Sequence, residues 1–101
     1  MKRVRVSNLA ERDLDEIWHY TAKTSGNVDI ANEVIESITD RFGLFAHTPE
    51  AGERRDEIDT GVRAFPIGRY IVYYRESAGR IVISRVIHGM RDQKTAFIGR
   101  D

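Results

Sequence analysis

The chain of 101 residues contains no cysteine, only two prolines and no long apolar run. Without cysteine, disulfide scaffolds, iron–sulfur clusters and thiolate zinc sites are excluded, and a reducing cytosol is the natural setting. No segment approaches the about 18 apolar residues that span a bilayer, and no apolar stretch follows the basic start at residues 2–5 as in a signal peptide. We therefore expect a cytoplasmic protein with no membrane partner.

Several motifs that carry chemistry are also absent. The sequence has no glycine-rich phosphate loop, no HExxH pair and no GxSxG elbow. The three histidines, His19, His47 and His88, fall on different predicted elements without the spacing of metal ligands. We therefore expect no metal site and no cofactor.

The chain as a whole has no net charge, but each of its halves does. Lysine and arginine number 16, as do aspartate and glutamate. Through residue 59 there are 8 basic and 13 acidic residues, and from residue 60 onward 8 and 3, so the halves carry −5 and +5. Zero net charge argues against a protein that coats DNA, and we predict no direct sequence-specific DNA binding. The basic half either meets an anionic partner or is neutralised by the acidic half within one fold, and charge alone leaves both interpretations open.

The N-terminal half has the pattern of one strand and two helices. Residues 2–7 alternate, with Val4 and Val6 on one face. Ser7 and Asn8 both offer N-caps, Asn8 followed by Glu11 resembles a capping box, and an apolar stripe at helical spacing follows. Gly26 is suited to a left-handed helix end, and Asn27 to the next N-cap. The first stripe consists of Ala10, Leu14, Ile17, Trp18 and Thr21, and the second of Ala31, Val34, Ile35, Ile38, Phe42 and Phe45.

The second helix should run unbroken until Pro49, whose ring disfavours helix at the preceding residue. The short linker between the two helices predicts an antiparallel hairpin. The acidic residues Asp13, Asp15 and Glu16 are placed on or near the face opposite the first stripe, so we interpret them as a solvated face.

The C-terminal half is rich in strand signals. Residues 49–61 are polar and bounded by glycine, which predicts a solvated loop. Strands are expected over 62–67, 70–75 and 80–88, joined by a hairpin turn over 76–79, with one weak helical turn at 96–98. Pro66 places the first of these strands at an edge or a bend. Ile81, Ile83 and Ile87 alternate along the last strand, and Gly89 should supply a positive φ after it.

These elements give an α+β fold in a single domain over residues 1–101. An N-terminal strand precedes an antiparallel helical hairpin, and a three-stranded antiparallel meander completes a β-α-α-β-β-β order. The helices should cover one face of the sheet. Tyr73 must face opposite to Tyr70 and Tyr74, so at least one of the three should be exposed.

Two stretches of the C-terminal half carry a family resemblance. Residues 62–75 read VRAFPIGRYIVYYR, and residues 83–92 read ISRVIHGMRD. With an Ala-x-x-Asp-Leu-x-x-Ile-Trp-x-Tyr pattern over 10–20 and a Pro-Glu-Ala-Gly turn over 49–52, the chain resembles the ParE branch of the RelE/ParE toxin superfamily. The resemblance covers nearly the whole chain in the right order.

The resemblance implies the toxin of a type II toxin–antitoxin system. It implies a ParD-like antitoxin whose C-terminal segment folds onto the toxin, and DNA gyrase as the target. Arginines on the sheet would pair with carboxylates of the antitoxin. We expect antitoxin contacts from Leu14, Trp18, Arg63, Arg69, Tyr73 and Arg85. We expect target contacts from His88, Arg91 and Asp92. A structural corner is the alternative for these last three residues, with Asp92 accepting hydrogen bonds from Arg91 or from nearby backbone. Core packing is the alternative for Trp18.

Two other functions remain open. RelE-like relatives cut messenger RNA on the ribosome, and here Arg63, Arg69 and Arg85 could hold a phosphate while His88 acts as the base. Two departures argue against this: Phe97 stands where such enzymes often have tyrosine, and the chain is not net basic. The other alternative is an interaction domain of the same fold without toxicity. We favour a toxin without catalytic residues.

Overall fold

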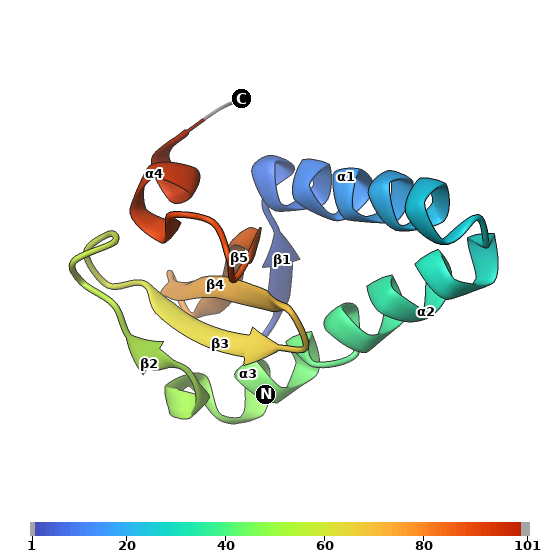
Figure 1. Ribbon diagram of the computed structural model, residues 1–101. Helices are drawn as coiled ribbons and strands as arrows, with labels where there is room; N and C mark the ends of the chain where they lie inside the picture. Colours follow the sequence, from blue (N-terminus) through green and yellow to red (C-terminus); the bar gives the residue numbers. More distant parts are fainter. Residues whose placement is uncertain (1, 100–101) are drawn as a thin grey trace.

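The computed structural model describes residues 2–99, which form one mixed sheet with helices on both of its faces (Figure 1). The strand order is β1-β5-β4-β3-β2. The elements are β1 (Val4–Val6), α1 (Asn8–Ser25), α2 (Val28–Thr39), α3 (Phe42–His47), a 3₁₀ turn (Pro49–Ala51), β2 (Glu53–Arg54), β3 (Arg63–Ile67), β4 (Tyr70–Ser77), β5 (Arg80–His88) and α4 (Gln93–Ile98). Within residues 2–99, no helix is both long and apolar enough to cross a membrane.

The sheet confirms the predicted α+β class and its antiparallel meander β3-β4-β5. The N-terminal strand β1 lies parallel to β5, with Val4 opposite Ile81 and Val6 opposite Ile83. The short strand β2 was not predicted, because residues 49–61 read as loop; it pairs only with the first residues of β3. Pro66 lies beyond that pairing, so β3 is an edge there and loses no hydrogen bond to the proline.

The helical hairpin of α1 and α2 forms as predicted, and the structure decides between the two candidate N-caps of α1. The N-cap of α1 is Ser7, whose Oγ accepts a hydrogen bond from the Ala10 amide (3.0 Å), and Asn8 is already helical. Ser7 is fixed there because its own hydroxyl also donates to the Ser84 carbonyl of β5 (3.0 Å). Gly26 ends α1 at φ 68°, and the Asn27 side chain caps α2, both as predicted.

The predicted second helix is wrong in its length, since it breaks into α2 and α3. At the break, the Arg41 amide bonds to the Ile38 carbonyl, a tighter turn than the α-helical pattern. The change of direction lets α3 pack under the sheet, where the Phe45 ring stacks on Tyr74 with centroids 4.0 Å apart. Helical spacing continues through the break, so periodicity did not reveal it.

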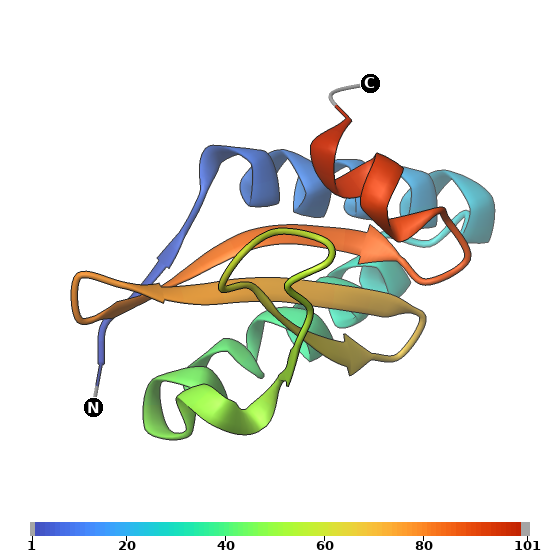
Figure 2. The same cartoon turned by 90° about the vertical axis from the view of Figure 1, so that its left-hand side faces the viewer.

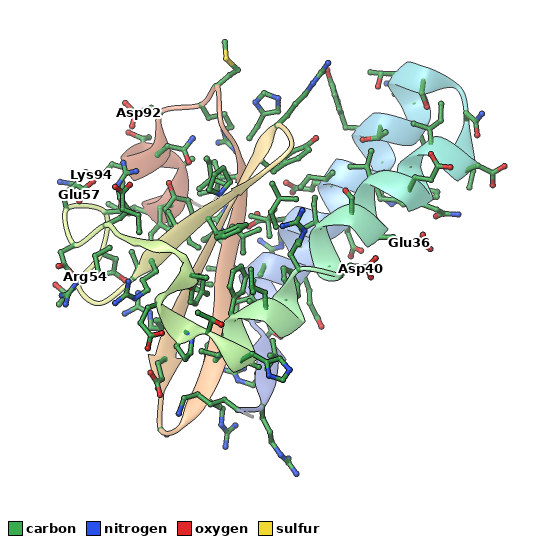
Figure 3. The ribbon with its side chains drawn as sticks, turned by 90° about the horizontal axis from the view of Figure 1, so that it is seen from below. Glu36, Asp40, Arg54, Glu57, Asp92 and Lys94 are labelled. Carbon is green, nitrogen blue, oxygen red and sulfur yellow. The ribbon has the colours of Figure 1, made fainter. Side chains whose placement is uncertain are left out.

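Both faces of the sheet are covered, which corrects the prediction of a single helical layer. The first core joins α1, α2 and α3 to one face; the second lies under α4 and the loop over 55–62, where Ile58 is buried. Figure 2 shows this loop and α4 on the side opposite α2 and α3, and Figure 3 separates Glu57 and Lys94 from Glu36 and Asp40 in the same way. Tyr73 does face opposite to Tyr70 and Tyr74, but the second layer leaves none of the three exposed.

A β-bulge in β5 changes which residues share a face. Tyr73 pairs with Arg85 but Tyr74 pairs with Ile83, so Ser84 is the extra residue. Ile81 and Ile83 therefore belong to the first core, whereas Ile87 belongs to the second. The predicted alternation of the three isoleucines on one face is wrong for this reason.

Gly89 follows β5 without the predicted positive φ. Instead its amide donates to the Arg69 carbonyl (2.8 Å), and a Cβ at this position would lie 3.4 Å from that oxygen. That distance is ordinary van der Waals contact, so the hydrogen bond, and not the lack of a side chain, ties the end of β5 to the β3–β4 turn.

Candidate partner-binding groove

A groove of about 780 Å³ lies between the helical hairpin and the end of the sheet where β3 turns into β4. Helices α1 and α2 supply one wall, and the β3–β4 turn, the end of β5 and Arg91 supply the other. The lining residues are Asp13, Glu16, Ile17, Tyr20, Thr21, Thr24, Val34, Ser37, Ile38, Ile67, Gly68, Arg69, Tyr70, Val86, His88 and Arg91. Its place between separate elements suits an extended or helical segment of a partner.

The bottom of the groove is apolar because it is formed by side chains of the first core. Ile17 and Ile38 are buried in the first core, as are Ile67 and Val86 of the sheet. Tyr20 stands one turn of α1 further out and is 65% exposed. An exposed aromatic ring above an apolar floor is the arrangement found where protein partners insert side chains.

The rim of the groove is charged with opposite signs on its two walls. The exposed carboxylate of Glu16 lies on the α1 wall, while Arg69 and Arg91 lie on the sheet wall. Among residues 2–99, neither arginine side chain makes a hydrogen bond or an ion pair. Two free guanidinium groups on one wall can bind carboxylates of an incoming segment in bidentate fashion.

His88 is held in place on the same wall. Its Nδ1 accepts a hydrogen bond from the Met90 amide (3.0 Å), and its ring packs edge-to-face on Tyr70 with centroids 5.3 Å apart. The accepted bond requires a lone pair on Nδ1, which leaves Nε2 to carry the proton and to donate. The imidazole is therefore a positioned hydrogen-bond donor at the groove.

The prediction that Asp13 belongs to a solvated face is wrong. Asp13 is 7% exposed, and its carboxylate grips Arg85 through Oδ2 to Nε (2.8 Å) and Oδ1 to Nη2 (2.9 Å). Oδ2 also accepts the Val86 amide (2.9 Å), which lies on the part of β5 that β1 does not cover. The Asp13 carboxylate thus accepts the backbone hydrogen bond that a neighbouring strand would otherwise accept from Val86. Its spacing of three from Ala10 and four from Ile17 was the sequence signal for burial.

Arg85 is buried at the other end of this pair and connects three elements. Its Nη1 donates to the carbonyls of Ala96 and Phe97 at the end of α4, each at 2.8 Å. The hydrogen bond to Asp13 raises the pKa of the Arg85 guanidinium above its ordinary value, and burial opposes this. The positive charge of Arg85 lies at the C-terminal end of α4, where the helix dipole favours a cation.

Two residues expected to contact the antitoxin are therefore not available on the surface. Arg85 is 7% exposed and fully engaged within the chain. Tyr73 is completely buried, and its hydroxyl donates to Oε1 of Gln93 in α4 (2.7 Å). Neither was recognised as buried because the second layer over this face was not predicted.

The other expected antitoxin residues are dispersed. Leu14 is half-buried against the first core, and Trp18 ties α1 to α2 through Nε1 and the Asn32 side chain (2.7 Å). Arg63 lines a separate pocket of about 210 Å³ and donates to the Gly52 carbonyl (2.8 Å). Of the six residues, only Arg69 lines the groove.

The three expected target residues follow one another along the chain but have different roles. His88 and Arg91 line the groove. Asp92 caps α4, accepting the Thr95 amide at 3.1 Å, and this bond lowers the pKa of the Asp92 carboxyl below its usual value. The capping role agrees with the structural-corner alternative for Asp92.

Comparison with known protein families shows to which family the chain belongs. Residues 4–93 match the family described as the ParE toxin of the type II toxin–antitoxin system parDE. The chain belongs to the ParE toxin family. Among its ParE relatives is Toxin ParE1 of Caulobacter vibrioides, 32% identical over 88 residues, which cover 87% of this chain and 90% of that protein.

Two further comparisons agree with this family. Toxin ParE3 of Caulobacter vibrioides is 27% identical over 89 residues, 88% of each chain. A solved structure described as the chromosomal ParDE toxin–antitoxin system of P. aeruginosa superposes with a TM-score of 0.77 over 87% of this chain and 96% of that one, at 20% identity. The ParE fold is thus reached from the coordinates as well as from the sequence.

Proposed function

We propose that this ParE-family toxin stalls bacterial growth by poisoning DNA gyrase and that a ParD-like antitoxin neutralises it. Family membership over residues 4–93 carries the proposal. The groove supports the antitoxin half, because an unfolded acidic and apolar segment finds there an apolar floor, Tyr20 and the free cations Arg69 and Arg91.

The antitoxin segment should lie in the groove with its apolar side chains over Ile17 and Val34 and its carboxylates toward the sheet wall. Burying apolar surface supplies most of the binding energy, and the charges fix the register. We infer that Arg69 and Arg91 act on the antitoxin, and that His88, held beside them, is covered when it binds. Target contacts by His88 and Arg91 would then be blocked by the antitoxin, which is one way for it to neutralise the toxin.

Ribosome-dependent cleavage of messenger RNA is the second candidate, and the placement of its proposed residues counts against it. Arg69 and His88 share the groove, but Arg85 is buried beneath α4 and Arg63 faces the separate pocket. Phosphate stabilisation and proton transfer require groups that converge on one reacting centre. Only two of the four do so.

Induced expression of the chain alone in a bacterial host tests the proposal. Gyrase poisoning predicts filamentous arrest, a DNA-damage response and loss of supercoiling when purified toxin is added to gyrase in vitro. Rapid cleavage of translated messenger RNA, with the supercoiling activity of gyrase unchanged, would instead show that the chain is a ribosome-dependent ribonuclease. Growth without arrest, from soluble folded protein, would favour an interaction domain without toxicity.

A further inference from the structure

The part of the sheet near the β4–β5 hairpin carries a second charged surface, formed by residues that do not line the groove. Arg5 of β1 lies opposite Val82 of β5, and Val82 lies opposite Arg75 of β4. Paired residues share a face, so these three form a row across three strands. Arg3 is placed beside Arg80 in a second row by the bond from the Ile81 amide to the Arg3 carbonyl (2.7 Å). We call Arg3, Arg5 and Arg80 the arginine face.

This part of the sheet is left bare by the second layer. Figure 2 shows the β4–β5 hairpin and β1 extending beyond both α4 and the loop over 55–62. Arg3, Arg5 and Arg80 are all exposed. The neighbouring side chains on the same face, Ser77 and Val82, are small, so they do not separate the guanidinium groups from one another.

The arginine face keeps its charge because the nearby carboxylates are engaged elsewhere. Asp59 pairs with Arg75, and Glu76 points to the other face, where it pairs with Lys2 at 2.7 Å. Within residues 2–99, Arg3, Arg5 and Arg80 make no side-chain hydrogen bond or ion pair. Strands lie about 4.8 Å apart, so three positive charges stand within about one Debye length of each other and act together.

We propose that the arginine face binds the phosphate backbone of double-stranded DNA. Protein interfaces are organised around buried apolar and aromatic anchors. Among the described residues, no exposed large apolar side chain lies on β1, β4 or β5. Single-stranded nucleic acid needs aromatic rings on which bases stack, and this face has none exposed. A cationic surface without either feature fits the backbone of a duplex.

Contacts of this kind carry no sequence information, so the proposal is compatible with the absence of sequence-specific DNA recognition. It goes beyond the action on gyrase and does not depend on it. In a cell, such contacts would raise the local concentration of the toxin along DNA and leave the groove, which is lined by other residues, free.

Salt dependence provides a quantitative test. The full chain is titrated into a labelled 20-base-pair duplex, and fluorescence anisotropy is read between 50 and 200 mM NaCl. Three phosphate contacts predict a slope of log Kobs against log salt of about −2.7, or about 40-fold weaker binding across that range. Duplexes of shuffled sequence should bind equally well.

Matched variants locate the binding. The triple variant R3Q/R5Q/R80Q should lower affinity at 50 mM salt more than tenfold and bring the slope close to zero. The control R12Q/K23Q/R41Q removes three exposed charges, two from α1 and one from the turn between α2 and α3, and should change the slope by less than one. Unchanged circular dichroism and urea midpoints confirm that both variants fold.

The proposal is overturned if the wild-type chain does not bind duplex DNA at 50 mM salt, or if the control variant loses as much affinity as the triple variant. Tighter binding of an RNA duplex or of polyglutamate at equal charge would assign the face to RNA or to an acidic protein instead. No gyrase is present in the measurement, so its outcome is separate from that of the proposed function.

Discussion

The carboxylate of Asp13 and the guanidinium of Arg85 form a buried two-point ion pair, with contacts of 2.8 and 2.9 Å between residues 72 positions apart. The pair joins α1 to β5, and Arg85 continues the connection to the carbonyls that end α4. A single charge pair therefore holds both helical layers to the same strand. The wall of the groove that Asp13 lines depends on this connection.

Removing one member of the pair should destabilise the fold strongly. In Asp13→Ala, Arg85 stays buried without its anion and the Val86 amide loses its acceptor. We expect the free energy of unfolding to fall by about 3–5 kcal/mol, measured by urea denaturation. A loss below about 1 kcal/mol would show that water reaches Arg85 and that the pair is not the connection described.

The double variant Asp13→Leu/Arg85→Met separates the charge from the packing. With both charges gone, no unpaired ion remains, so stability should recover by more than half of the single-variant loss. Recovery should stay incomplete, because the Val86 amide and the Ala96 carbonyl have lost their partners, at a cost of about 1–3 kcal/mol. A double variant less stable than Asp13→Ala would contradict this account.

Gly52 is required for packing rather than for backbone freedom. Its φ is −83°, which any residue adopts, but a Cβ would lie 2.8 Å from Cε1 of Tyr74 and 3.0 Å from the Ala64 carbonyl. Tyr74 cannot withdraw, since its hydroxyl accepts the Gly52 amide and donates to the Pro49 carbonyl, each at 2.7 Å. Gly52→Ala should therefore cost about 1–3 kcal/mol in urea denaturation.

Gly43 is the matched control for that substitution. It lies in α3, and no atom lies within 4 Å of the Cβ that an alanine would add. Gly43→Ala should leave the fold intact or stabilise it by about 0.5–1 kcal/mol, because alanine loses less backbone entropy in a helix. Equal destabilisation by both variants would remove the packing explanation for Gly52.

The sequence predicted the elements whose signals are local. The strand over 80–88 has its observed bounds, and the caps at Gly26 and Asn27 appear where turn chemistry placed them. Alternation also gave the correct face for Tyr73. Each of these depends on residues a few positions apart, where propensity and periodicity act.

The errors arose where distant parts of the chain meet. Asp13 was assigned to solvent because its partner Arg85 is remote in sequence. The break at Arg41 and the bulge at Ser84 leave no mark in composition, since both are set by how the helices curve around the sheet. The prediction of the binding site was the least accurate, because only Arg69, His88 and Arg91 of the predicted site residues line the groove.

The tip of the β4–β5 hairpin contains a strained residue. Ala78 has φ 53° and Gly79 φ 76°, the left-handed pair that a two-residue type I′ turn demands. An alanine there costs about 1 kcal/mol, and asparagine adopts this region more readily. Ala78→Asn should raise the urea midpoint, while Gly79→Ala should lower it. Equal effects from the two substitutions would argue against the turn type.

The free cations of the groove should decide how tightly the antitoxin binds. Arg69→Glu/Arg91→Glu places two like charges against an acidic segment, so affinity for the antitoxin should fall at least 100-fold, mostly through faster dissociation. Surface plasmon resonance with the ParD-like antitoxin that neutralises the chain measures this. Arg12→Glu/Arg41→Glu makes the same charge change at two exposed positions outside the groove and should alter affinity less than threefold. Equal losses would mean that net charge, not this wall of the groove, attracts the antitoxin.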